Sequence, residues 1–357
     1  MDIFKFNEIF DDDTHNVTKI PKNQYKKSGI IPIIDQGKEF IAGYTDYCKS
    51  KKIESTRIIF GDHTRIIKLI DFKACIGADG VKVLKIKNKN ADYKYMYYYL
   101  KKSYIPDTGY NRHFKWLKEL KFTLPLIEEQ KTISAKLDKV QEIIDIRQEQ
   151  IKGLDQVIKS KFNEMFGNVN DNKNNYEIKT LNEIFEFIKD GTHSTPTYTD
   201  DKINGVKFLS AKDVTTGTIN WDNIKYIPLE LHNQLIKRVK PQKNDILLAK
   251  NGTTGICAKV DRDDIFDIYV SLALLRPKKG YLVEYLVQAI NNDVTKEQFD
   301  KNLKGVGVPN LHLREIQKVK IVVPPIELQD EFAEIVKQIN KQKVILQNSL
   351  EEMQKLQ

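Results

Sequence analysis

The chain has 357 residues, of which 40% are hydrophobic and 30% are charged, and its formal net charge is +9. This length predicts more than one folded domain, and the composition excludes a disordered chain. No apolar run approaches the length that spans a bilayer, the N-terminus lacks the pattern of a signal peptide, and the three cysteines lie far apart. We therefore expect a cytoplasmic protein with no membrane segment, no disulfide framework and no metal site.

Residues 1–125 are predicted to fold into a β-rich domain that also contains helices. Short runs of β-branched residues, as in 57–72 and 80–86, are interrupted by Gly, Asn and Asp. This pattern is typical of strands joined by turns. The tyrosine-rich run at 93–99 is predicted to form a helix that turns an aromatic face to the core, rather than a platform on which bases stack.

Residues 126–167 are predicted to form one long helix. Pro125 stands where a helix tolerates proline, at the first turn, and the glutamates that follow suit the positive end of the helix. Apolar residues then recur at a spacing close to alternating three and four, which indicates a coiled-coil seam. The seam residues are Ile133, Leu137, Val140, Ile144, Ile151, Leu154 and Ile158.

A second domain and a second helix follow. An Asn/Asp-rich stretch at 168–176 leads into another mixed domain, residues 168–323, and residues 324–357 are predicted to form a long helix that starts after Pro325. Neither helix can bury its apolar stripe alone, so we expect the two to form an antiparallel coiled coil. The alternative is two unrelated amphipathic helices, each lying on its own domain. The second seam comprises Phe332, Ile335, Ile339, Leu346, Met353 and Leu356, and Gln342 and Ser349 interrupt it.

The chain contains an internal repeat. The distance between matched positions grows steadily along the chain, from 175 to 199 residues. This growth predicts two copies of one α+β unit, the second with roughly 24 more residues in loops (199 − 175). The matches pair residues 7–10 with 182–185, 61–62 with 244–245, 95–100 with 285–290, and Gln130 with Gln329.

The positive charge is unevenly distributed. Residues 1–125 carry +9 (24 Lys and Arg, 15 Asp and Glu) and residues 168–323 carry +3, whereas 126–167 carry −1 and 324–357 carry −2. Basic domains joined to neutral or acidic helices favour binding to a polyanion such as nucleic acid. The alternative is a lysine-rich proteome in which many proteins are basic.

Two β-rich domains, each followed by a long helix that opens with P-x-I/L-x-E-Q, form a distinctive arrangement. The first helix ends in Phe-x-x-Met-Phe-Gly, and the runs "FGDHTR" (60–65) and "DGTHSTPTY" (190–198) mark the domains. Over essentially its whole length, the chain resembles the specificity (S) subunit of type I restriction–modification systems. It departs from the pattern at the second helix start, which has Glu-Leu-Gln where the first has Glu-Glu-Gln.

The resemblance implies a non-catalytic subunit that recognises double-stranded DNA. Residues 1–125 and 168–323 would be two target recognition domains, each reading one half of a bipartite, asymmetric site. The helices 126–167 and 324–357 would set the spacing between half-sites and dock two modification (methyltransferase) subunits. It also implies that S-adenosylmethionine, ATP and Mg²⁺ belong to partner subunits, including restriction/translocase subunits, with no cofactor in this chain.

No catalytic motif is found in the sequence. An Asn/Asp-Pro-Pro-aromatic site for base methylation is absent, because the only Pro-Pro pair, Pro324-Pro325, follows a valine. Residues 251–255 lack the Gly-Lys-Ser/Thr of a phosphate-binding loop. We predict no catalytic residue. Two other readings stay open: a stand-alone nuclease or methyltransferase with degenerate motifs, and a coiled-coil scaffold whose domains bind protein.

Polar turns supply the candidate DNA contacts. Phosphates are bound by Lys, Arg and hydroxyl groups on loops, and base edges are read by Arg, Asn, Gln, Ser or Thr. For each position, an ordinary turn with a capping side chain is the alternative. The candidates are His63, Thr64, Arg65, Asn111, Arg112, His113, Lys115, Thr192, His193, Ser194, Lys212, Thr253, Lys304 and Asn310.

Overall fold

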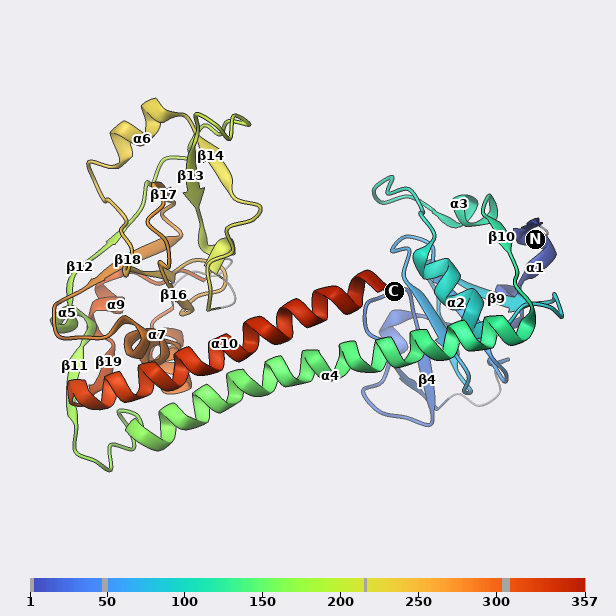
Figure 1. The fold of residues 1–357 in the computed structure, drawn as a ribbon, viewed down its shortest axis with the longest axis horizontal. Coiled ribbons are helices and arrows are strands. Elements are labelled where there is room, and N and C mark those ends of the chain that lie inside the picture. The colour runs from blue at the N-terminus through green and yellow to red at the C-terminus, as the bar shows by residue number, and fades with distance from the viewer. Residues whose placement is uncertain (1–2, 47–50, 215–216, 304–308, 357) are drawn as a thin grey trace. The chain divides into compact units, whose positions relative to one another are not determined.

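The computed structural model describes residues 3–46, 51–214, 217–303 and 309–356 and divides into two compact units. Unit 1 comprises Met1–Gln148 with Ser349–Gln357, and unit 2 comprises Glu149–Asn348. Each unit mixes strands and short helices, and each contains part of the two long helices α4 (Ile127–Phe166) and α10 (Ile326–Leu356) (Figure 1). This arrangement confirms the predicted fold class.

Unit 1 contains two four-stranded sheets. The first is antiparallel, with the order β2–β9–β6–β7: Phe10–Asp12, Val81–Ile86, Arg57–Gly61 and Ile67–Ile70. The second has the order β3–β8–β4–β5: Lys19–Ile20, Cys75–Gly77, Ile31–Ile34 and Gly43–Thr45. The remaining elements are β1 (Ile3–Lys5), which pairs with β10 (Lys121–Thr123), the helices α1 (Phe6–Ile9), α2 (Tyr93–Lys102) and α3 (Phe114–Lys118), and the 3₁₀ turns η1 (Thr14–Asn16) and η2 (Lys22–Gln24).

Unit 2 repeats this plan. Its antiparallel sheet has the order β12–β18–β15–β16: Phe185–Asp190, Leu272–Pro277, Ile246–Ala249 and Cys257–Lys259. Its second sheet has the order β14–β13–β17: Lys225–Ile227, Val206–Leu209 and Phe266–Ile268. The other elements are β11 (Glu177–Thr180), paired with β19 (Lys320–Val323), the 3₁₀ turn η3 (Ala211–Val214), and the helices α5 (Leu181–Ile184), α6 (Leu229–Leu235), α7 (Val283–Asn291), α8 (Asp293–Asp300) and α9 (Leu313–Lys318).

The two units share one topology, which confirms the internal repeat. The order β2–β9–β6–β7 corresponds to β12–β18–β15–β16, and β8–β4–β5 corresponds to β17–β13–β14. One sequence match is wrong. Gly61 is the last residue of β6 and pairs with Val81, whereas residues 244–245 precede the equivalent strand β15, in which Ala249 occupies the place of Gly61 and pairs with Leu272.

A buried glutamine lies at the same position in the first turn of both long helices. In unit 1, the amide of Gln130 donates to the carbonyl oxygens of Asn90 (2.7 Å) and Pro125 (2.8 Å) and accepts from the backbone N–H of Asp92 (2.9 Å). In unit 2, the amide of Gln329 donates to Pro324 (2.9 Å) and accepts from Leu282 (3.1 Å). Asp92 and Leu282 are the N-cap residues of α2 and α7. Each glutamine therefore ties the first turn of a long helix to the start of a domain helix.

Replacing Gln329 with Met is expected to lower the free energy of unfolding by about 2 kcal/mol, because it leaves the half-buried Leu282 N–H and the buried Pro324 carbonyl without partners. Chemical denaturation of the full chain measures this loss. The matched control is Gln338→Met, on the exposed side of α10, for which we expect a change within about 0.5 kcal/mol. Equal losses for the two variants would contradict the anchoring role.

The core of unit 2 is built around four aromatic rings. Phe162 and Phe166 of α4, Tyr285 of α7 and Phe332 of α10 are buried, with ring centroids 5.0–5.5 Å apart. The hydroxyl of Tyr285 donates to the carbonyl oxygen of Val322 (2.6 Å). The long helices are therefore fixed to this unit by packing on α7.

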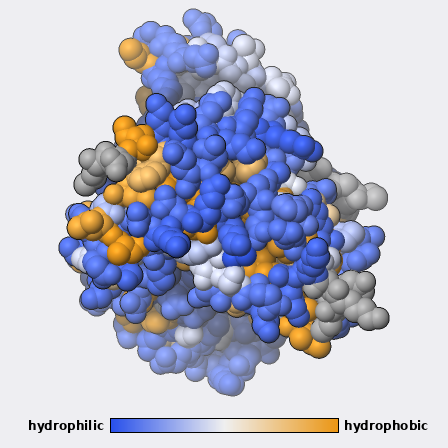
Figure 2. Space-filling model, turned by 90° about the vertical axis from the view of Figure 1, so that its right-hand side faces the viewer, coloured by the Kyte–Doolittle hydropathy of each residue, from blue (hydrophilic) through white to orange (hydrophobic). Residues whose placement is uncertain are grey.

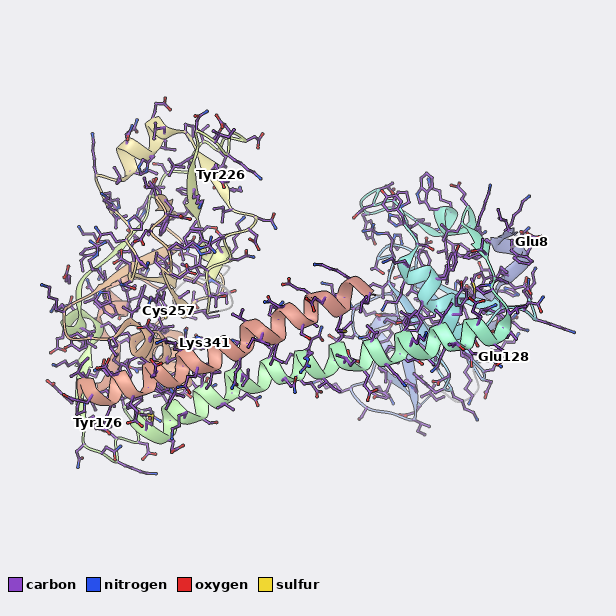
Figure 3. The ribbon with its side chains drawn as sticks, viewed as in Figure 1. Glu8, Glu128, Tyr176, Tyr226, Cys257 and Lys341 are labelled. Carbon is purple, nitrogen blue, oxygen red and sulfur yellow. The ribbon has the colours of Figure 1, made fainter. Side chains whose placement is uncertain are left out.

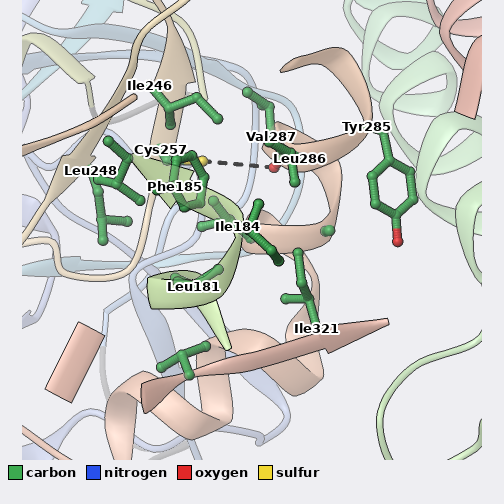
Figure 4. Close-up of a cluster of buried hydrophobic side chains, with 14 of the residues drawn as sticks. Leu181, Ile184, Phe185, Ile246, Leu248, Cys257, Tyr285, Leu286, Val287 and Ile321 are labelled. Atoms are coloured by element: carbon green, nitrogen blue, oxygen red, sulfur yellow. Dashed lines mark hydrogen bonds between the residues drawn. The ribbon is translucent and has the colours of Figure 1, made fainter. Parts of the chain in front are cut away.

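Beside these rings, the sheet contributes aliphatic side chains and one thiol. Cys257 is fully buried, and its Sγ donates to the carbonyl oxygen of Val287 (3.7 Å) (Figure 4). Burial raises the pKa of the Cys257 thiol. Cys257 on β16 and Tyr226 on β14 lie in the two different sheets of unit 2 (Figure 3).

Within unit 2, α4 and α10 run antiparallel. Phe332, near the start of α10, contacts Phe162 and Phe166, near the end of α4, and Lys343 forms an ion pair with Asp155 at 2.6 Å. All the predicted seam residues except Leu356 are buried or half-buried; Leu356 is 62% exposed, so its prediction is wrong. Those that are fully buried are Ile144, Ile158, Phe332 and Ile339, and those that are half-buried are Ile133, Leu137, Val140, Ile151, Leu154, Ile335, Leu346 and Met353. Leu350, which the sequence pattern missed, is also buried.

The face of the molecule drawn in Figure 2 is mainly polar, because hydrophilic residues predominate on it and hydrophobic residues form small separate groups. Within the described ranges, no helix has both the length and the apolar character required to cross a membrane.

Candidate nucleic-acid interface

In unit 1, the loop after β6 meets the loop that precedes α3. The Nδ1–H of His63 donates to the carbonyl oxygen of Asn111 (3.1 Å), and the His63 ring stacks on Tyr110 with centroids 4.8 Å apart and an interplanar angle of 9°. Arg65 binds the carboxylate of Asp107 (2.5 Å). Arg65 has φ 62°, a left-handed conformation that lets the loop between β6 and β7 close. The two loops that the sequence predicted to contact DNA thus form one surface.

A third loop, which follows β4, holds this junction together. The side-chain oxygen of Gln36 accepts from the backbone N–H of His63 (3.1 Å), and its carbonyl accepts from the hydroxyl of Thr64 (2.6 Å). Gly80 has φ 59°, and a Cβ there would lie 2.5 Å from the Gln36 side chain and 2.6 Å from the His63 ring. Only glycine fits at that position, which lets the loops approach closely.

The DNA-contact prediction for His113 is wrong. Its side chain is 0% exposed, and its Nδ1–H donates to the carbonyl oxygen of Asp62 (2.9 Å). The backbone N–H of His113 donates to the same carbonyl (2.8 Å), and the residue caps α3. His113 therefore shapes the loop from inside. Arg112 and Lys115 on either side of it are exposed, as are Thr64 and Asn111.

Unit 2 has the equivalent junction. Lys250 follows β15 as Asp62 follows β6, and its carbonyl accepts from the backbone N–H of Leu311 (2.8 Å), as Asp62 accepts from His113. Asn251 forms an antiparallel bridge with Asn310. Thr253 is exposed in the first of these loops and Asn310 is half-buried in the second, whereas Lys304 lies outside the described residues.

A buried carboxylate adds a third loop to the unit 2 junction. Asp190, at the end of β12, lies 3.3 Å from Lys250, 2.6 Å from Arg238 and 3.2 Å from the Nε2 of His193. Burial alone would raise the pKa of Asp190, but the hydrogen bond from Arg238 and the charge of Lys250 hold it below its ordinary value of 3.8. The carboxylate thus binds the loop after β12 to the loop after β15 as an ion cluster.

The loop after β12 carries three of the sequence-selected residues. The backbone of Thr192 accepts from Val270 (3.0 Å) and donates to Ile268 (3.1 Å), and the residue is half-buried. His193 and Ser194 are exposed at the turn. Lys212 is exposed in η3, on the loop after β13, the strand that corresponds to β4. Thr253 and Asn310 therefore occupy loops equivalent to the predicted loops of unit 1, whereas Thr192, His193 and Ser194 follow the counterpart of β2 and Lys212 follows the counterpart of β4.

Several residues of these surfaces were not predicted from the sequence. Gln36, Asp190, Lys250 and Arg238 act through contacts between loops 27 to 60 residues apart, which single-sequence patterns do not reveal. Tyr110 lies in a loop that the sequence analysis predicted to contact DNA, and the glycine and polar residues beside it were the features that could have identified it. Tyr198, with Lys225 3.9 Å above its ring, was also missed.

The chemistry of both junctions is that of binding. They present guanidinium, ammonium, hydroxyl and amide groups, which suit phosphate oxygens and base edges. Among the residues that the structure describes, no group of three or more His, Cys, Asp and Glu side chains has the arrangement of a metal site. The pair of His232 and Asp267, 2.6 Å apart, is almost entirely buried between α6 and β17, and the pair of His193 and Asp190 belongs to the ion cluster described above.

Comparison with known proteins supports this assignment. Residues 1–156 and 173–355 match the family model described as the type I restriction modification DNA specificity domain. The MjaVIII type I restriction enzyme specificity subunit of Methanocaldococcus jannaschii is 26% identical over 298 residues, covering 76% of this chain and 69% of that protein. The EcoBI specificity subunit of Escherichia coli is 23% identical over 247 residues, covering 62% of this chain and 52% of its own length.

Solved structures share the fold. The S subunit of a type I restriction–modification system from M. genitalium superimposes with a TM-score of 0.53 at 17% identity and covers 99% of this chain and 93% of that one. A chain from a study of complex assembly and conformational transition of the type I R-M system gives 0.54 at 17% identity, covering 97% and 94%. With both halves of its repeat matched by the family model, this chain belongs to the type I restriction–modification DNA specificity family.

Proposed function

We propose that the chain is the non-catalytic sequence-recognition subunit of a type I restriction–modification complex, acting in the cytoplasm. Each unit reads one half of a bipartite, asymmetric site in double-stranded DNA. The observation that carries this proposal is the repeated loop junction. Both units bring the loops after equivalent strands together, but with different side chains: His63, Arg65 and Asn111 in one, Asn251, Thr253 and Asn310 in the other. Two loop junctions with the same backbone arrangement but different side chains suit the recognition of two different half-sites.

The long helices are proposed to set the half-site separation. α4 has 40 residues and α10 has 31, which correspond to about 60 Å and about 46 Å at 1.5 Å per residue. These lengths exceed one turn of B-DNA, about 34 Å, so helices of this size suit half-sites that are read about one turn apart.

The helices also offer a docking surface for modification subunits. Within unit 2, an apolar groove of about 470 Å³ runs between α4 and α10, lined by Gly153, Leu154, Val157, Ile345 and Leu346. Val157 and Ile345 are exposed there, and an apolar groove on a helix pair suits an apolar helix of a partner. Methyl transfer from S-adenosylmethionine, and cleavage with ATP and Mg²⁺, are assigned to modification and restriction/translocase partners.

Reconstitution tests this proposal. The wild-type chain, co-expressed with the modification subunit of its own system, is expected to co-purify with it and to direct methylation to one bipartite motif. Ile345→Asp places a charge in the groove and is expected to weaken the complex about ten-fold or more and to abolish the motif. The matched control is Ile265→Asp, because both isoleucines are 68% exposed but Ile265 lies outside the helices.

Two outcomes of this reconstitution contradict the proposal. Methylation by the purified chain without the modification subunit would identify a stand-alone methyltransferase instead. Retention of the modification subunit by Ile345→Asp would remove the groove as its docking surface. Circular dichroism of each variant verifies that the helices remain folded.

A further inference from the structure

The exposure of the Tyr110 side chain does not contribute to the stability of unit 1. Its side chain is 89% exposed, although the loop around it is tightly built. The carboxylate of Asp107 accepts from the backbone N–H of Gly109 (3.0 Å), and the side chain of Asn111 donates to the carbonyl of Thr108. Gly109, with φ 74°, makes the turn. The loop thus holds a large aromatic ring out in solvent, where it gains little hydrophobic free energy.

One face of this ring is supported and the other is open. The parallel stack with His63 covers one face, and the hydrogen bond from His63 to the carbonyl of Asn111 fixes the supporting ring to the same loop. Arg65 reaches this loop from the other side of the junction through Asp107, and Arg112 follows two residues after the tyrosine. An exposed aromatic ring held in a loop that carries Arg112 and binds Arg65 suits a surface on which phosphates lie next to bases.

Unit 2 lacks this feature at the equivalent place. His63 directly follows the Asp62 carbonyl that receives the second loop, and its counterpart after Lys250 is Asn251. In the described residues 309–310, Pro309 accepts from Gly252 N–H (3.3 Å) and Asn310 bridges Asn251. The sequence from 303 to 312 contains no Phe, Tyr or Trp. The loop junction is therefore present in both units, but only the junction of unit 1 presents an aromatic ring.

We propose that the Tyr110 ring is a specificity-determining contact to a base of the half-site read by unit 1, and that His63 is the positioning residue that supports it. This inference rests on the proposed function of unit 1 as a DNA reader. The contact is made by the open face or edge of the ring, which packs against a base in the groove as apolar side chains do. The phenol hydroxyl is not needed for it.

Methylation mapping of the complex with its modification subunit tests this role. Tyr110→Ala is expected to relax one position of one half-site by about ten-fold in preference and to leave the other half-site unchanged. Tyr110→Phe keeps the ring and is expected to retain wild-type preference. His63→Ala is expected to relax the same position to a smaller extent, because the ring stays but loses its support.

Tyr104→Ala is the matched control, since Tyr104 is 83% exposed and lies just after α2 in the same unit. It is expected to leave the motif unchanged. A wild-type motif with unchanged preference in Tyr110→Ala overturns this inference alone, and so does a loss of preference in Tyr110→Phe as large as in Tyr110→Ala. If the wild-type complex shows no bipartite motif at all, the proposed function itself fails.

Discussion

Asp190→Asn is expected to lower the free energy of unfolding by about 3 kcal/mol, because it leaves the buried ammonium group of Lys250 without its carboxylate. Asn has nearly the size of Asp, so the loss reports charge rather than a cavity. The same change removes the charge that attracts Arg238 and His193, which lie 2.6 Å and 3.2 Å from the carboxylate. Chemical denaturation of the full chain measures the loss.

The control is Asp263→Asn, whose carboxylate pairs with Lys243 at 3.0 Å on the surface. An exposed pair contributes about 0–1 kcal/mol, so this variant is expected to unfold nearly as the wild type does. Adding Lys250→Met to Asp190→Asn removes the stranded charge and is expected to restore most of the stability. Similar losses for Asp190→Asn and Asp263→Asn would contradict the buried cluster.

The contribution of Asp190 also depends on pH with a defined sign. The folded protein holds its pKa below the ordinary value of 3.8, so the unfolded chain takes up the proton first as the pH falls. The stabilisation is therefore complete above a pH of about 4 and is lost as the pH falls through the depressed folded value. The difference in stability between wild type and Asp190→Asn is expected to shrink as the pH is lowered from about 5 to about 2. A difference that grows over this range would contradict the assignment.

Local patterns in the sequence predicted the long helices and the repeat. Pro125 and Pro325 mark the two helix starts, and Gln130 and Gln329 occupy the same place in each, because each amide must satisfy backbone groups at the start of a domain helix. The apolar spacing along α4 and α10 correctly predicted the buried and half-buried seam residues, except for Leu356 at the end of α10, which is exposed. Ser349 interrupts the pattern and hid Leu350, whose burial depends on its neighbours in three dimensions.

Long-range contacts account for what the sequence did not show. The polar loop around His113 predicts a surface residue, but the ring of His113 is buried and donates to the carbonyl of Asp62, 51 residues away in the chain. The match of residues 61–62 with 244–245 is wrong because a similarity of two residues is too short to reveal that unit 2 has extra loop residues before this position. Asp190 and Lys250 are ordinary charged residues until the fold places one beside the other.

Exchange of a whole recognition domain has the largest expected functional effect. Residues 176–323 begin just before β11 and end at β19, and the pair Glu177 and Val323 shows that the two cut points are adjacent in the sheet. Gln329 binds the backbone N–H of residue 282, so most incoming sequences retain that hydrogen bond. The incoming domain must supply an aromatic residue in place of Tyr285, which packs on Phe162 and Phe166.

The decisive measurement is a genome-wide map of methylated bases in cells that carry the intact chain and in cells that carry this exchange. We predict a bipartite motif in which the exchange replaces one half and leaves the other half as it was. That result shows that residues 176–323 read one half-site and residues 1–125 the other. A methylation map that is the same before and after the exchange would contradict recognition by these domains and would favour a protein-binding scaffold.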